Sequence, residues 1–443
     1  MRSVGDVRRV VVWFFAAVVL LVASAARAEV SVAKGSDWEL YTQGRVNAFL
    51  STGFGDAHPL TIHGPNELNI TPGGGLDTDV DVIPRTDAAG NPIQGTFRSM
   101  RLRSGFVPNV FAVGLRGQLT ENTTYKIYVA FWMTIEAEGQ RKFNNPFAYA
   151  REGYGKLEGP WGGLLVGRAL DLFSRGATEN EFLYGHGFGL GYPGNVADVG
   201  PAAGMIGFGV LAAFFASGIQ YSTPMLAGLQ LNVGVFDPVV ITGYYPGTRE
   251  PLFESEATYD FSRGRFKLHL FGNGAYQKLY LAASNTSATM DGLGYGGRIE
   301  FGPFHLGFAG HYGNGLGLSY ALENSATSIS QNNELRRFDG YSVQAQIQAR
   351  GFDFNLGWGI SRVFLLQSDR DSIANCALDT DVIDPARQCA SLIKRQIGYS
   401  AAVVYHIRDR VHLDLDYLRG DFAWFLGEKQ MVNFINAGVT VTW

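Results

Sequence analysis

The chain has 443 residues, of which 46% are hydrophobic, 13% aromatic and only 17% charged, and its formal net charge is −4. This negative balance excludes a general role in binding nucleic acid, because such binding needs a surplus of Lys and Arg. The 57 glycines and the many aromatic residues are typical of a membrane β-barrel, in which few charges can face lipid. No Pro- or Ser-rich linker divides the chain, so we expect one large closed sheet rather than two globular domains.

The first residues have the pattern of an export signal. Three arginines precede an apolar run over residues 10–26, and an Ala-Arg-Ala cleavage motif ends at Ala28. We therefore expect residues 1–28 to be removed as a signal peptide, leaving residues 29–443 as a single barrel. The alternative is a membrane-anchoring helix, although the run is at the lower limit of length for spanning a bilayer. No later segment is apolar enough to predict a membrane-spanning helix.

Many segments alternate between apolar and polar residues, and this alternation predicts β-strands with one apolar and one polar face. The clearest examples are residues 40–50, 127–135, 341–350, 352–361, 411–417 and 435–443. The last of these closes the chain on Trp443, and a terminal alternating strand with a final aromatic residue is typical of outer-membrane barrels. A soluble β-sandwich would also show such alternation, so the connections must separate the two cases.

Short and long connections alternate along the chain. Short ones, rich in Gly, Pro or charge, are expected at 120–123, 158–162, 224–228, 262–264, 302–303, 350–351 and 408–410. Long ones are expected at 54–96, 139–145, 171–207, 238–251, 281–290, 321–335, 367–392 and 418–428. This order predicts an all-β, transmembrane, antiparallel up-and-down barrel of about 16 strands, with tight periplasmic turns and long outer loops around an aqueous channel.

Basic residues follow the polar face of the early strands. An arginine facing lipid near the midplane costs about 2–4 kcal/mol, so such residues are expected to face water inside the barrel. We predict that the pore is lined by Arg45, Arg101, Arg103, Arg116 and Lys126. Charges around a wet lumen set ion preference, which leaves an anion-selective or solute-selective channel open as an alternative to a general one.

The sequence holds no convincing catalytic or metal site. No G-x-S-x-G motif is present, and the eight histidines are scattered, so we predict neither an enzyme nor a cofactor. His305 and His311 share one face of a strand, and we interpret them as lining residues rather than metal ligands. Asp77, Asp79 and Asp81 resemble a calcium loop, but valine stands where that loop needs glycine, so we interpret them as a solvated acidic stretch.

Two cysteines, Cys376 and Cys389, lie in one polar stretch. Because an exported chain meets oxidising conditions, we predict that they form a disulfide that closes one loop. The alternative is a pair of free thiols.

Residues 151–168 carry a more specific pattern, with Arg-Glu-Gly-Tyr-Gly-Lys-Leu, a Gly-Pro-Trp-Gly-Gly turn and a strand that ends in Gly-Arg. Together with the hairpin at 217–228, this segment resembles the general diffusion porins of Gram-negative bacteria. The resemblance covers the mature chain by architecture and residues 145–237 by motif. It implies a sixteen-stranded barrel, usually trimeric, whose third long loop, here 171–207, folds inward and narrows the pore.

The same resemblance suggests where the constriction lies. It implies that Arg168, the arginine of Gly-Arg, lines the constriction on the wall, and that Glu181, in a Glu-Phe context, faces it from the loop. Asp171 and Glu179 are further candidates. Opposed charges across a narrow gap would create a transverse field that orders water and dipolar solutes. The apolar run over residues 205–216 departs from the family pattern and leaves solute preference open.

The sequence therefore favours an outer-membrane porin for passive diffusion of small hydrophilic solutes and ions. The expected partners are membrane lipid and lipopolysaccharide, the solutes themselves and two further copies of the chain in a homotrimer, with no nucleic acid. The main alternative is a plugged barrel that acts as a surface adhesin or structural protein. A barrel enzyme is disfavoured because no Ser–His or Asp–His pair is evident at a rim.

Overall fold

The structure is a computed structural model of the whole chain. It describes residues 29–57, 59, 82–133, 135, 148–183, 204–239, 247–248, 250–281, 286–319, 321–322, 329–330, 334–371, 393–408 and 410–443. The predicted signal peptide, the acidic stretch at 77–81 and both cysteines lie outside the described residues, so the expectations about them stay predictions. No helix among the described residues is long and apolar enough to cross a membrane.

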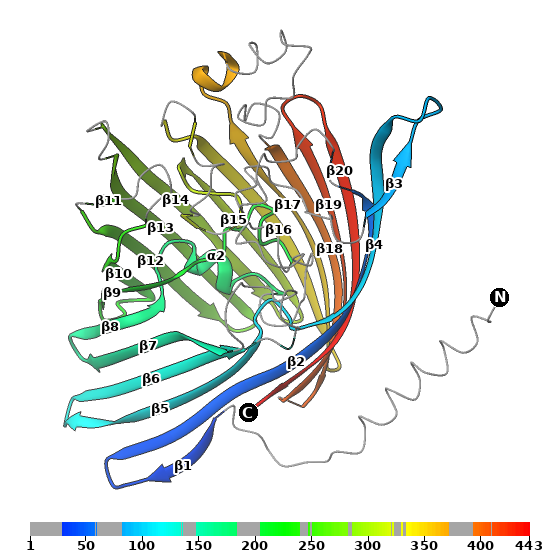
Figure 1. Cartoon of the computed structure of the whole chain (residues 1–443). Coiled ribbons are helices and arrows are strands. Elements are labelled where there is room, and N and C mark those ends of the chain that lie inside the picture. The colour runs from blue at the N-terminus through cyan, green and yellow to red at the C-terminus, as the bar shows by residue number, and fades with distance from the viewer. Residues whose placement is uncertain are drawn as a thin grey trace.

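Twenty strands join in one antiparallel sheet that curves into a barrel (Figure 1). The strands are β1 (Val30–Lys34), β2 (Trp38–Asp56), β3 (Val82–Thr86), β4 (Pro92–Arg103), β5 (Asn109–Thr120), β6 (Thr123–Met133), β7 (Ala148–Gly159), β8 (Gly162–Leu170), β9 (Phe215–Ser222), β10 (Leu229–Phe236), β11 (Gly247–Thr248), β12 (Leu252–Arg263), β13 (Phe266–Leu281), β14 (Thr286–Phe301), β15 (Phe304–Asn314), β16 (Arg337–Ala349), β17 (Phe352–Phe364), β18 (Ile393–Ile407), β19 (Val411–Trp424) and β20 (Lys429–Thr442). A short helix, α2 (Arg175–Glu179), follows β8.

The barrel closes where the last strand pairs with an early one. In this seam β20 runs antiparallel to β2, with Thr442 opposite Arg45 and Val432 opposite Gly55. Three of the twenty strands, β1, β3 and β11, each pair with one other strand only and add no position around the wall. β4 and β5 pair with the two halves of β2 and together count as one position. The wall therefore has 20 − 3 − 1 = 16 strand positions. The predicted sixteen-stranded antiparallel barrel is confirmed.

The alternation of the sequence sets the two faces of the wall. On β2, Val46 and Leu50 point outward and are 50% and 47% exposed, whereas Tyr41 and Phe49 point inward and are almost fully buried. Successive side chains of a strand point to opposite faces, so the apolar rows meet acyl chains while the other rows meet the interior. The same division holds on the other strands whose alternation was noted above.

Aromatic residues on the outer face mark two levels of the wall. Near the short turns, Phe352 stacks on Tyr405 with their ring centroids 4.4 Å apart. Farther up the wall, Tyr341 of β16 lies against Trp358 of β17, with ring centroids 5.7 Å apart. Aromatic girdles of this kind lie at the two interfaces of the bilayer and enclose an apolar band about 25 Å tall.

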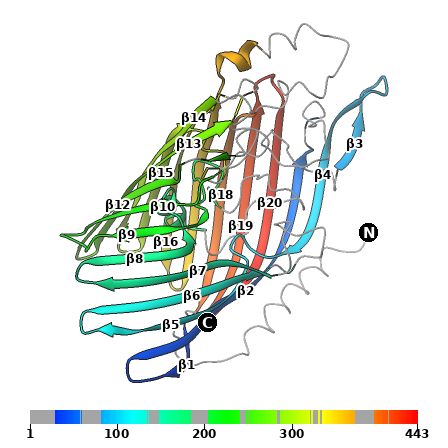
Figure 2. The same cartoon turned by 60° about the vertical axis from the view of Figure 1, so that its left-hand side comes forward.

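The short turns agree with the sequence, but the long connections do not all exist. The predicted loops at 281–290 and 418–428 are mostly strand, because β13 and β14 are separated only by residues 282–285, and β19 and β20 only by 425–428. The inward apolar pattern continues there, with Met290 and Trp424 each only 2% exposed. The first long connection instead contains the hairpin of β3 and β4, which projects beyond the rim (Figures 1 and 2).

The wall is uneven in height. β13 and β14 have 16 residues each, whereas β8, β9 and β10 have 9, 8 and 8. Figure 2 shows β7 to β10 lying low on one side while β18 to β20 rise steeply on the other. A membrane-spanning strand needs about 9–11 residues, so the low side is at or below the minimum.

The main apolar core lies inside the barrel rather than between two sheets. It joins residues of the third long loop, such as Phe173 and Phe208, to inward residues of the wall, such as Phe338, Phe422 and Trp424. The run over 205–216 that departs from the resembled pattern belongs to this core. The interior is therefore packed against part of the wall, and buried polar residues such as Asn47 and Asp416 lie on other parts of its inner face.

Candidate functional site

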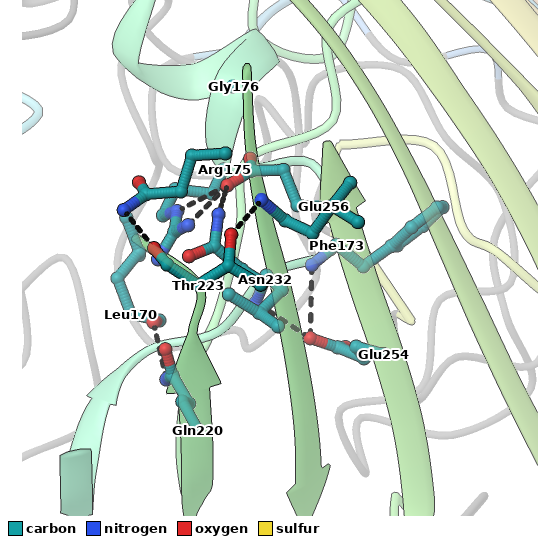
Figure 3. A network of polar contacts seen from close by, with 12 residues as sticks. Leu170, Phe173, Arg175, Gly176, Gln220, Thr223, Asn232, Glu254 and Glu256 are labelled. Atoms are coloured by element: carbon teal, nitrogen blue, oxygen red, sulfur yellow. Dashed lines mark hydrogen bonds and ion pairs between the residues drawn. The ribbon is translucent and has the colours of Figure 1, made fainter. Parts of the chain in front are cut away.

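Two described stretches of the third long loop, 171–183 and 204–214, are bonded to inward side chains of the wall. In the first stretch the backbone amides of Leu172 and Phe173 donate to one oxygen of Glu254 on β12, at 2.7 and 3.0 Å (Figure 3). Farther along, the amide of Phe182 donates to Gln344 on β16 at 3.0 Å. This part of the predicted inward-folded loop thus runs along the inside of the wall from β12 to β16.

The second stretch is fixed to β17 and β18. The amide of Gly209 donates to the hydroxyl of Ser361 at 2.9 Å, and the side-chain amide of Gln396 donates to the carbonyl of Gly207. The wall admits this approach because it has glycine there: a Cβ at Gly359 would lie 1.8 Å from the carbonyl oxygen of Phe208. Such a close approach of two backbones requires glycine, so a side chain at residue 359 would push the loop away from β17.

A buried acidic cluster holds the first stretch. Asp171, Glu254 and Glu256 are 2%, 4% and 3% exposed, and Arg175 of α2 donates to Glu256 from Nε at 3.1 Å (Figure 3). One guanidinium thus faces three carboxylates in a dry site. Burial, and then the charge of Glu254, raise the pKa of Asp171 well above its usual value.

The candidate acids have different positions from those that the resemblance implied. Asp171 accepts from the amide of Phe214 at 3.1 Å, and Glu181, only 4% exposed, accepts from the amides of Leu183 and Met205 at 2.7 and 3.3 Å. Both carboxylates therefore form hydrogen bonds within the loop region and connect its two described stretches. Of the three acids, only Glu179 is exposed to water. Desolvation by the surrounding protein still raises its pKa, and the nearby charge of Arg175 offsets part of that increase.

Arg168 is on the wrong face for a constriction. The register of β8 places it opposite Gly153 on β7 and Ser217 on β9, on the same face as Val166, which is 49% exposed on the lipid side. Its neighbour Gly167 has the inward position. The structure thus contradicts the predicted role of Arg168, because a shift of one residue along a strand exchanges the two faces.

The predicted pore-lining residues all lie on the inward face. The pairing of neighbouring strands fixes the inward position of each of them, namely Arg45, Arg101, Arg103, Arg116 and Lys126. Lys126 lies over the ring of Tyr128 at 4.9 Å, and Arg116 lies 4.5 Å from the centroid of Tyr41 and pairs with Glu39 at 2.9 Å. These contacts hold the cations against the wall of β2 and β4–β6, which we call the basic wall.

The described part of the loop and the basic wall belong to different sides of the lumen. The loop is bonded to β12, β16, β17 and β18, whereas the basic wall extends from β2 through β6. A solute inside the barrel therefore meets a loop on one side and a row of cations on the other.

The sequence reasoning missed the residues that anchor the loop. Glu254 and Glu256 share the inward parity of β12, and two acids at alternate positions of one strand were the signal available. Their partners come from another part of the chain, which parity alone does not identify. His305 and His311 do not meet, since His305 bonds Gln346 at 2.7 Å, and no three His, Cys, Asp or Glu of the described residues are arranged to hold a metal.

Comparisons with known proteins give the same architecture. The structure is similar to the outer membrane channel DcaP of Acinetobacter baumannii, with a TM-score of 0.62 and 14% identity over 94% of this chain and 100% of that one. It is also similar to an anion-selective porin from Comamonas acidovorans (TM-score 0.55, 14% identity, 92% and 100% covered) and to OprB of Pseudomonas putida (0.53, 10%, 90% and 94%). At these identities the likeness shows the fold alone.

No curated protein matches the sequence. The model of the family described as Gram-negative porin matches residues 16–423, which is most of the chain. Its members are outer-membrane channels through which small solutes diffuse, and they are not enzymes. With its sixteen-position barrel, wet basic wall and inward loop, this chain belongs to the Gram-negative porin family.

Proposed function

We propose that this porin passes small hydrophilic solutes through the space between the third long loop and the basic wall, with a preference for anions. The single observation that carries the preference is the inward register of five cations on consecutive positions of the wall. A row of fixed charges inside a narrow wet lumen raises the local concentration of counter-ions and lowers that of co-ions. Glu29 and Glu39 both pair with Arg116 and offset its charge, so the preference is moderate.

Strand β4 offers a matched pair for the test. Arg101 is opposite Ser51 on the inward face, whereas Arg98 is opposite Phe54 on the outward face. Reversal potentials are measured in planar bilayers with asymmetric KCl for Arg101→Glu and for Arg98→Glu. We expect Arg101→Glu to move the ion preference toward cations and Arg98→Glu to leave it unchanged. Equal reversal potentials in both variants and the parent protein would remove the basis for anion preference.

We place Glu179 at the loop side of the narrow region, because it is the acid of the loop that is open to water. Asp171 and Glu181 support the narrow region by holding the loop and do not face the solute. Glu179→Gln should change the single-channel conductance in low salt and leave the melting temperature unchanged. An unchanged conductance would mean that Glu179 lies outside the path of the ions.

We also propose that the protein assembles as a homotrimer through its low side. The support is the short length of β9 and β10 and a groove of 960 Å³ on the outer face, whose lining includes Ile219, Val233 and Tyr276. A partner subunit would cover the wall where it is too short to span the hydrocarbon region alone. Light scattering of the detergent-solubilised protein should give three copies, and Val233→Arg should reduce that number. A monodisperse monomer in mild detergent would contradict this assembly.

Two further expectations concern residues outside the described part of the chain. We propose that residues 1–28 are cleaved as a signal peptide, which intact-mass measurement of the exported protein would test directly. We also propose that Cys376 and Cys389 are joined in a disulfide, because the exported chain folds under oxidising conditions. Alkylation without prior reduction should then label neither cysteine.

A further inference from the structure

Two histidines meet on the inner face of the wall, away from both the loop and the basic wall. His406 on β18 is directly opposite His412 on β19, and both have the inward parity of their strands. Their Nδ1 atoms are 2.7 Å apart, and the two rings cross at 83°. Because β18 ends at Ile407 and β19 begins at Val411, the pair lies beside a short turn. Short turns are on the periplasmic side of such barrels, so the pair is at the periplasmic mouth of the lumen.

A carboxylate fixes the orientation of one of the two rings. Nε2 of His406 is 3.0 Å from Oδ2 of Asp353 on β17, and the side-chain amides of Gln346 and Gln348 lie 3.4 Å from the same oxygen. Since a carboxylate accepts hydrogen bonds, Nε2 of His406 carries the proton, and in the neutral ring Nδ1 has the free lone pair. A carboxylate in this position is the usual partner of a histidine that binds a metal, because it fixes the ring and makes Nδ1 more basic. Nδ1 of His406 is therefore aimed at His412 as an electron-pair donor.

The distance between the two nitrogens indicates which metal fits them. Imidazole nitrogens bind divalent transition metals at about 2.0 Å, so two neighbouring nitrogens of a square-planar ion are about 2.8 Å apart and two of a tetrahedral ion about 3.3 Å. The 2.7 Å between His406 and His412 is close to the first value and needs a larger opening for the second. Square-planar geometry is typical of Cu²⁺, which also has the highest affinity for nitrogen ligands, whereas Ca²⁺ and Mg²⁺ require oxygen ligands.

We propose that His406 and His412 form an exchangeable binding site for a divalent transition-metal ion, with Cu²⁺ preferred to Zn²⁺. The ion takes the place of the proton between the two Nδ1 atoms, and that proton passes to water. No three His, Cys, Asp or Glu of the described residues are arranged around one metal, so water completes the coordination and the ion can leave again. The side chain of His406 is 27% exposed, which leaves the pair open to solvent. The site does not depend on which ions or solutes the channel prefers.

The test measures metal binding by the full mature protein in detergent. Isothermal titration with CuCl₂ and ZnCl₂ compares the parent protein with His412→Gln, in which the glutamine can still bond His406, and with Asp353→Asn. We expect the parent to bind Cu²⁺ more tightly than Zn²⁺. Asp353→Asn should weaken Cu²⁺ binding about 10-fold, as is usual for the partner of a ligating histidine, and His412→Gln should weaken it further.

Strand β13 supplies the matched control. His269 is also inward and also bonds a carboxylate, Asp260, at 2.8 Å, but Arg298 and not a second histidine is opposite it on β14. His269→Gln should therefore leave the affinity for Cu²⁺ unchanged. Equal Cu²⁺ affinity in the parent and in His412→Gln would show that the two histidines only share a hydrogen bond, and would overturn the proposal. Tighter binding of Zn²⁺ than of Cu²⁺ would overturn the metal preference.

Electron paramagnetic resonance of the bound Cu²⁺ identifies the ligands independently of the affinity. We expect nitrogen couplings from two imidazoles in the parent and from one in His412→Gln. Two imidazole nitrogens that persist in a His406→Gln/His412→Gln double variant would place the ion elsewhere and overturn the proposal. Circular dichroism and channel conductance without metal, recorded on the same variants, separate a loss of binding from a folding defect and from any failure of the channel function. In bilayers, saturating Cu²⁺ adds positive charge at the mouth, so it should shift the reversal potential toward anions in the parent and not in His412→Gln. No shift in the parent would overturn the position of the site beside the path of the ions.

Discussion

Replacing Glu254 by alanine tests whether the buried acidic cluster anchors the third long loop. The substitution leaves the amides of Leu172 and Phe173, both fully buried, without their acceptor. An unsatisfied buried amide costs about 1–3 kcal/mol, and removing one of three crowded carboxylates offsets part of that loss, so we expect a net weakening of about 2 kcal/mol. This corresponds to about a 30-fold increase in the fraction of molecules whose loop is detached.

Hydrogen exchange followed by mass spectrometry measures this fraction at the residues concerned. In Glu254→Ala, peptides that cover residues 171–183 should lose protection, whereas peptides of β16 to β20 should keep theirs. Single channels should show more frequent transient changes of conductance, because the loop borders the open part of the lumen. Glu300→Ala is the matched control, since Glu300 is also inward but bonds Lys267 and Arg298 rather than the loop. Unchanged protection at 171–183 in Glu254→Ala would refute the anchoring role.

Three other perturbations follow from the same geometry. The pKa of Asp171 is raised above its unfolded value of about 3.9, so its contribution to loop attachment is fully present below that pH and is lost as the pH rises through the folded pKa. Hydrogen-exchange protection of residues 171–183, corrected for intrinsic exchange rates, should therefore fall with rising pH. Asp171→Asn should remove this pH dependence. Gly359→Ala places a methyl group 1.8 Å from the carbonyl oxygen of Phe208, so we expect it to cost about 1–3 kcal/mol and to lower the melting temperature, as measured by circular dichroism. Arg168→Glu should leave reversal potentials unchanged, because the side chain is on the outer face; a shift toward cations would show that the register of β8 is different in the membrane.

The sequence alone predicts which side chains of the wall face outward and which face inward. It does not predict which segments meet inside the barrel. Period-two alternation identified the strands and the inward position of residues such as Lys126, because the two faces of a barrel meet different solvents. It also explains the error at Arg168, since a motif taken from a resemblance fixes residue type but not parity. The anchoring of the loop by Glu254 could not be predicted, because it depends on which residues of distant segments meet inside the barrel.

The loop lengths show the same limit. The polar composition of 281–290 and the glycines and charges of 418–428 favoured long connections, but pairing with neighbouring strands and burial of side chains such as Met290 extended the ladder. Local propensity competes with tertiary contacts, and in a large sheet the contacts prevail. Conversely, the hairpin of β3 and β4 was hidden within a stretch expected to be a loop, because β3 has only five residues and pairs only with β4.

The seam between β2 and β20 has a consequence for biogenesis. The amide of Met431 bonds Asp56 across a separation of 375 residues, and Gly44 and Trp443 exchange backbone hydrogen bonds at the end of the same seam. Contacts between such distant residues form slowly, because the whole intervening chain must first be ordered. Until the final strand arrives, both borders of the sheet present unpaired backbone groups, which hydrocarbon does not tolerate and other chains readily bind. Closure by β20 is thus the step that removes both borders, and we expect a chain truncated before β20 to form aggregates rather than smaller pores.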